Sequence, residues 1–235
     1  MKKSIFLSLI FFINLCFFTV NAQERRFSAN FELVKVNKGK KVTIKGEVHY
    51  NIETGKMVMV FSAPLKYIYI STSKGEAQIY QPKENTVSVK NDQNLSSKED
   101  MLYYFVTNKT NDLGLLSVGY VIEKTTNEKG LVRKIWKNSN PKQKIPKVEM
   151  VYKFQQPIYS AYFDAKENLK KKIFYSDYLS FGLYSVPMKI VEIDYVNAKD
   201  STISKKTYSG VKTNKDAISP YYSYKVPANA RVIKM

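Results

Sequence analysis

The chain has 235 residues, of which 44% are hydrophobic, with a formal net charge of +18, one histidine and one cysteine. This length is sufficient for one domain with a core of its own. A single cysteine excludes an internal disulfide, and with only one histidine beside it there is little basis for a zinc site or a Cys-His nucleophile.

The N-terminus has the pattern of a secretory signal peptide. Lys2 and Lys3 precede an uncharged apolar run at 5–20, and Ala22 offers a cleavage site. We therefore expect a signal peptide at 1–22 and a single mature domain at 23–235, placed in the periplasm. A membrane anchor is the competing interpretation, disfavoured because polar sequence follows the run at once. Cys16 lacks the small preceding residues of a lipoprotein site, so we reject lipid attachment there.

The positive charge has two interpretations. In an exported chain it favours anionic lipid head groups or an acidic partner over nucleic acid. Many lysines, however, alternate along predicted strands or gather in turns such as 38–41 and 170–172. On that interpretation the lysines lie on the solvent-facing side of an antiparallel sheet and prevent its edge strands from pairing with other chains.

Alternating apolar residues predict strands in the N-terminal half. Residues 27–36 alternate with period two, and five short segments between Val42 and Val89, separated by turn residues, predict a β-meander. In the first of these, Val48 and Tyr50 share an apolar face, whereas His49 is expected on the wet face. Residues 56–61 are apolar on both faces, so something must cover each side.

A helix and further strands are predicted beyond residue 91. Ser96 stands three residues before Glu99, a capping-box spacing that predicts a helix over about 97–108, and a short helical or irregular piece follows at 112–117. Further strands are predicted at 120–124, 131–137, 147–154, 159–164, 172–178, 188–196, 202–208 and 223–226. About a dozen strands with little helix indicate a mainly β domain, a barrel or sandwich with a helical cover.

The titratable residues form no catalytic pattern. His49 is isolated, and no phosphate-binding glycine loop or nucleophile elbow occurs. The acidic pair Glu99-Asp100 suits a helix start, and Glu192 with Asp194 is expected to face solvent from a strand. The sequence therefore predicts no enzyme, no metal and no cofactor.

Several motifs occur together in a familiar order. These are Gly46-Glu47-Val48-His49-Tyr50, the segment 55–64 ending in Ala63-Pro64, Tyr69-Ile70-Ser71, Gln78-Ile79-Tyr80-Gln81-Pro82 and the closing segment 224–232. Together they resemble the LolA/LolB-type lipoprotein carriers. The resemblance implies an unclosed antiparallel β-barrel, a helical lid and an apolar cavity for acyl chains. Two features depart from that pattern: Asn51-Ile52-Glu53 lacks the basic residue of the first turn, and no long helix precedes the first strand.

The resemblance implies a periplasmic carrier of lipoprotein acyl chains or another lipid. It would take cargo from an inner-membrane donor to an outer-membrane acceptor, as a monomer that binds no nucleic acid. We expect lipid contacts from one wall, from the lid and from the opposite wall: Met57, Met59 and Phe61; Met101, Leu102 and Phe105; and Met150 and Tyr152. The same eight residues could form solid core, and the alternative function is an envelope protein that binds a partner or an anionic membrane through its basic face.

Overall fold

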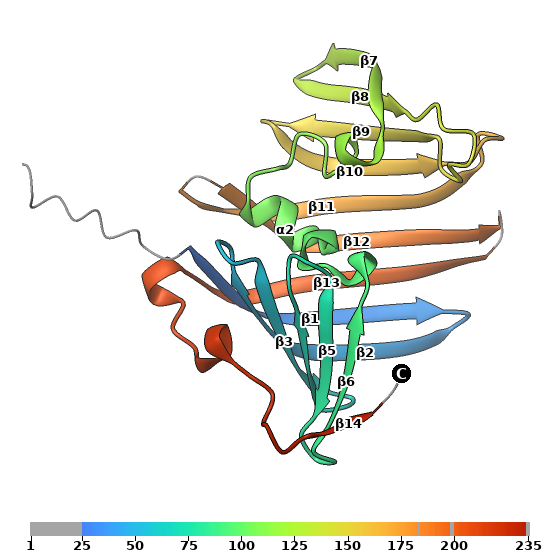
Figure 1. The fold of residues 1–235 in the computed structure, drawn as a ribbon. Helices are drawn as coiled ribbons and strands as arrows, with labels where there is room; N and C mark the ends of the chain where they lie inside the picture. Colours follow the sequence, from blue (N-terminus) through green and yellow to red (C-terminus); the bar gives the residue numbers. More distant parts are fainter. Residues whose placement is uncertain (1–24, 183, 198–199, 234–235) are drawn as a thin grey trace, which may run out of the picture.

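The computed structural model describes residues 25–182, 184–197 and 200–233. The predicted signal peptide at 1–22 lies outside the described residues. Within them, fourteen strands form a single curved sheet that hydrogen bonds do not close into a barrel, and the one α-helix is short (Figure 1). The expected class, a mainly β unclosed barrel with a short helical cover, is confirmed, with two more strands than the dozen predicted.

The strand order in the sheet is β14-β6-β5-β4-β3-β2-β1-β13-β12-β11-β10-β9-β8-β7. The strands are β1 Arg26–Asn37, β2 Lys40–Asn51, β3 Lys56–Ala63, β4 Tyr67–Ser71, β5 Glu76–Gln81, β6 Thr86–Asn91, β7 Val121–Glu128, β8 Leu131–Lys137, β9 Lys147–Lys153, β10 Gln156–Phe163, β11 Leu169–Phe181, β12 Tyr184–Asn197, β13 Asp200–Thr213 and β14 Arg231–Ile233. Neighbours are antiparallel except β14, which runs parallel to β6. The predicted hairpins therefore pair as expected.

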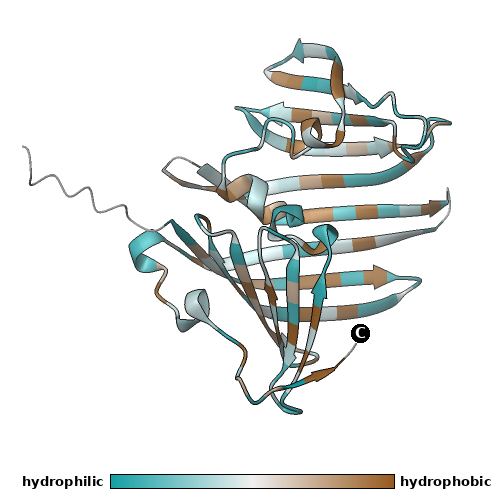
Figure 2. Ribbon diagram, viewed as in Figure 1, coloured by the Kyte–Doolittle hydropathy of each residue, from teal (hydrophilic) through white to brown (hydrophobic). Residues whose placement is uncertain are grey.

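The two halves of the chain meet in the middle of the sheet. β1 pairs on one side with β2 and on the other with β13, from Phe27 opposite Thr213 to Asn37 opposite Thr202. Hydropathy alternates along these central strands (Figure 2). The sheet thus has one apolar inner face, which carries the helix, and an outer face.

The helix begins later than predicted. Ser96 caps only a 3-10 turn, η3 (Ser97–Glu99), by accepting from the Lys98 amide at 3.2 Å. Asp100 is extended, at φ −72° and ψ 135°, and its carboxylate caps α2 (Met101–Val106) by accepting from the Leu102 amide at 2.8 Å. The continuous helix predicted over 97–108 is therefore wrong, because two successive caps divide it. The piece at 112–117 is a turn that leads into a 3-10 turn, η4 (Leu116–Val118).

The C-terminal segment, which we define as 214–233, crosses the outer face of the meander. It holds two 3-10 turns, η5 (Asn214–Asp216) and η6 (Pro220–Ser223), before β14 (Figure 1). The strand predicted at 223–226 is wrong. Ser219 caps η6 by accepting from the Tyr221 amide at 3.2 Å, and Pro220 suits the first position of a helical turn.

The C-terminal segment also corrects the predicted place of His49. His49 is only 6% exposed, because its ring stacks on Tyr221 at a centroid distance of 5.0 Å and meets the edge of Tyr222. The same segment packs on a second apolar cluster on the outer face: Val58, Ile68, Ile70, Tyr80 and Val87. The expectation that both faces of 56–61 are covered is confirmed.

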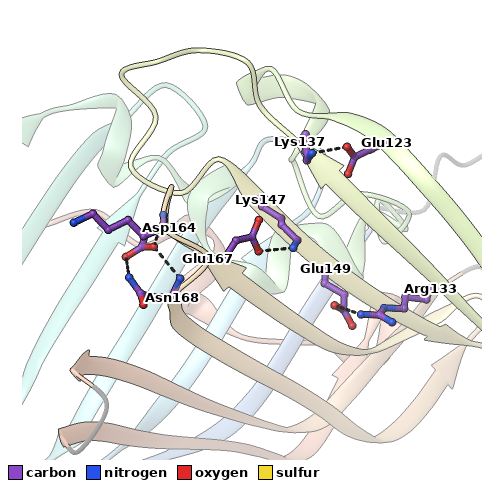
Figure 3. A network of polar contacts seen from close by, with 9 residues as sticks. Glu123, Arg133, Lys137, Lys147, Glu149, Asp164, Glu167 and Asn168 are labelled. Carbon is purple, nitrogen blue, oxygen red and sulfur yellow. Dashed lines mark hydrogen bonds and ion pairs between the residues drawn. The ribbon is translucent and has the colours of Figure 1, made fainter.

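On β8 and β9, basic residues lie on the surface of the sheet and pair with acidic residues. Among β7–β10 and the following loop, Arg133 pairs with Glu149 at 2.6 Å, and Lys147 pairs with Glu167 at 2.5 Å (Figure 3). In a third pair, Lys137 of β8 lies 2.5 Å from the carboxylate of Glu123 on β7. Such exposed pairs contribute about 1 kcal/mol or less. Their arrangement fits the interpretation in which lysines on strands face solvent and protect the edges of the sheet.

Candidate functional site

The inner face carries a continuous apolar cluster that extends, in sheet order, from β3 to β8. All eight residues predicted to contact lipid belong to it: Met57, Leu102, Phe105, Met150 and Tyr152 are buried in it, and Met59, Phe61 and Met101 pack partly buried against it. The structure therefore brings the two predicted walls and the helix together. Contact with a lipid stays a prediction for each of these residues.

The helix α2 fills the space over the inner face. Leu102, Phe105 and Val106 point into the cluster and are at most 2% exposed. The Phe105 ring meets Tyr175 at 5.6 Å and Tyr178 at 6.2 Å between centroids. The region beneath α2 is thus packed in this state, and an acyl chain could enter it only if the helix moved.

The walls on either side are held by aromatic contacts and one hydrogen bond. Phe61 stacks on Tyr67 at 4.1 Å and meets the edge of Phe31 at 5.4 Å between centroids. On the far wall, the Tyr152 hydroxyl donates to the carbonyl oxygen of Asn111 at 2.6 Å. This bond fixes the loop after α2 to β9, so the helix is attached to the far wall through its C-terminal side.

A hollow of about 230 Å³ remains open beside the first turn of α2. Its lining is Leu33, Met101, Ile173, Ile190, Glu192, Ser204 and Lys206. Of the eight predicted residues only Met101 reaches it. Alternation along β1 places Leu33 on the face of Phe27 and Phe31, so the period-two pattern could have identified this wall; the pairing of β1 with β13 could not be inferred from the pattern.

The sequence patterns did not predict that charged residues gather at this hollow. Lys206 lies 3.9 Å from the Asp100 carboxylate, and Lys171 pairs with Glu192 at 2.9 Å and with Asp194 at 3.2 Å. Glu192 and Asp194 were expected to face solvent. They lie instead on the inner face, because β12 pairs Glu192 with Ile173, and at the edge of the hollow their side chains remain 32% and 42% exposed.

Burial governs how these groups titrate. Burial raises the pKa of Glu192, the hydrogen bond with Asp194 raises it further, and Lys171 opposes both. Burial lowers the pKa of Lys206, but Asp100, the hydrogen bond with Tyr208, and Glu192 together more than offset this, so its pKa rises above the ordinary value. The Lys206 ammonium is therefore charged at neutral pH.

Other kinds of site find no support in the part of the chain that the structure describes. No group of three or more histidine, cysteine, aspartate or glutamate side chains lies close enough there to hold a metal ion. None of the helices in that part is both long enough and apolar enough to cross a membrane.

Comparison with known proteins rests on structure alone, because no protein-family model and no curated sequence matches this chain. Similar folds include a LolA superfamily protein from Nitrosomonas europaea, with 11% identity, a TM-score of 0.55, and 87% of this chain and 91% of that one covered. A DUF1329 family protein from Desulfovibrio piger gives 14% identity, a TM-score of 0.57 and the same coverage. A domain named for outer membrane lipoprotein sorting, from Vibrio parahaemolyticus, has 11% identity and a TM-score of 0.55, with 86% of this chain and 89% of that one covered. The chain has a LolA-like fold.

Proposed function

We propose that residues 23–235 form a non-enzymatic periplasmic carrier, which binds the acyl chains of a lipoprotein or another lipid on the inner face of the sheet. The observation that carries the proposal is the continuous apolar inner face covered by the six-residue helix α2. A helix this short has little stability of its own, so α2 is held by packing and can leave its place without unfolding the sheet.

The energies of the two states are of similar size. Re-exposing Leu102, Phe105 and Val106 costs about 1.5–3 kcal/mol each, or about 5–9 kcal/mol in total. An acyl chain that buries a dozen methylenes on the same wall contributes about 10 kcal/mol. Cargo therefore replaces the helix at little net cost, and the returning helix assists release. A carrier between a membrane donor and an acceptor needs this near balance.

Native mass spectrometry of the protein from its own envelope fraction tests the proposal. We expect co-purifying lipid, and after its removal renewed binding of a triacylated lipopeptide. Phe61→Glu on the wall should abolish that binding, whereas Phe154→Glu, at a turn position that is 84% exposed, should leave it unchanged. A delipidated protein that takes up no lipopeptide would refute the carrier function.

The alternative is adhesion to an anionic membrane through basic residues. It predicts salt-dependent binding to anionic vesicles that is unchanged in Phe61→Glu and extracts no lipid. The pairing of Arg133 and Lys147 with carboxylates reduces the charge available in that part of the surface.

A further inference from the structure

The hollow beside α2 places two charged groups, Lys206 and Glu192, among aliphatic side chains. β13 sets Lys206 directly between Leu33 of β1 and Ile190 of β12, with Ile173 on the next strand. The Lys206 side chain is only 22% exposed. A cation in such surroundings is costly unless an anion or hydrogen-bond acceptors accompany it.

The partners of Lys206 leave room for another acceptor. Its ammonium has three N–H donors. Asp100 lies 3.9 Å away, too far for a hydrogen bond, and that carboxylate already accepts from the Leu102 amide. One of the three donors forms a hydrogen bond with the Tyr208 hydroxyl, while Glu192 is held by Lys171 at 2.9 Å.

We propose that this hollow binds the anionic head group of an amphiphile, a carboxylate or a phosphate ester, on Lys206, with the first methylenes against Leu33 and Ile190. The inference rests on the proposed carrier function and adds to it the class of ligand and the residue that selects it. Ser204, which also lines the hollow, offers a hydroxyl to the same head group.

The size of the hollow determines where the rest of the ligand runs. An apolar cavity of about 150 Å³ holds a benzene-sized molecule. The 230 Å³ seen here therefore accommodates a head group and a few methylenes, and a longer chain must continue past Met101 beneath α2.

The head group also acts on the helix. Asp100 is both the N-cap of α2 and the ion-pair partner of Lys206. An anion bound on Lys206 competes with Asp100, so it weakens the attachment of the helix N-terminus to β13. Head-group binding thereby favours the displacement of α2 that exposes the apolar wall to the chain.

Titration calorimetry at pH 7 with decanoate, decyl phosphate and decanol tests the proposal. We expect at least one of the two anions to bind about tenfold tighter than decanol, and Lys206→Met to remove that preference while Lys206→Arg retains it. Lys205→Met is the matched control, because Lys205 is the preceding residue of β13, carries the same charge and is exposed. Asp100→Asn keeps a good N-cap but removes the competing charge, so it should strengthen anion binding.

The outcomes separate this inference from the carrier function. Equal affinities for all three ligands, or a preference that survives in Lys206→Met, would overturn the role of Lys206 and leave the carrier intact. Inorganic phosphate binding as tightly as decyl phosphate would show an ion site without an amphiphile and would also overturn it. If the triacylated lipopeptide and all three decyl ligands fail to bind, the carrier function fails as well.

Discussion

Truncating Phe105 tests whether α2 is a lid or a fixed part of the core. The Phe105 ring is fully buried and fixes the last turn of the helix between Tyr175 and Tyr178. Phe→Ala at a buried site costs about 3–5 kcal/mol. If α2 detaches while the sheet stays folded, that cost falls on the covered state alone and shifts opening by at least about 100-fold.

Because cargo binds only the open state, the apparent affinity of Phe105→Ala for a neutral ligand such as decanol should rise, by up to the same factor. Calorimetry measures the affinity, and urea denaturation measures the free energy of unfolding. Ile70→Ala is the control, since it removes a buried side chain from the outer-face cluster and should lower stability without changing affinity. An affinity of Phe105→Ala that is unchanged or weaker, with the full loss of unfolding free energy, would show that α2 is fixed core.

Three further predictions concern stability. In Gly46→Ala the new methyl group would lie 2.9 Å from the Phe31 ring and would also meet a neighbouring carbonyl, so the free energy of unfolding in urea should fall by about 1–3 kcal/mol; no loss would contradict this packing. Burial lowers the pKa of His49, so the folded state disfavours the proton that the unfolded state accepts; stability should fall as pH drops below about 6.5, and His49→Gln should flatten urea denaturation midpoints between pH 7.5 and 5. Tyr221→Ala removes the ring stacked on His49, so limited proteolysis should cut the C-terminal segment faster than in the wild type, and an unchanged rate would show that other contacts hold it.

Local patterns were sufficient to predict the strands between residues 27 and 208 and the apolar face of the helix, but not the C-terminal segment, where the strand predicted at 223–226 is wrong. The alternation around Val48 and Tyr50 marks the side chains that enter the inner-face cluster, and the apolar run at 56–61 reflects burial on both faces. The helix begins later than predicted because Asp100, not Ser96, is its N-cap. The Ser96–Glu99 spacing alone does not show which of these two residues caps the helix.

Contacts between distant segments could not be predicted in this way. His49 was expected to face water because nothing near it in sequence covers it, whereas Tyr221 does so from the far end of the chain. The hollow at Lys206 likewise depends on β1 lying beside β13, and periodicity specifies faces but not neighbours. Residue type and periodicity therefore identified the apolar walls and the helix of the candidate site, but not the hollow where the two halves join.

The pairing of β1 with β13 also determines how the chain can fold. The meander from β1 to β6 can form from hairpins within microseconds, but β1 then presents a free edge of twelve residues until β13 is available. In a chain that emerges N-terminus first, the strand that joins the two halves of the sheet is the last long one to appear. Folding time is therefore set by this non-local pairing, and during that interval the β1 edge is the place where two copies would join and aggregate.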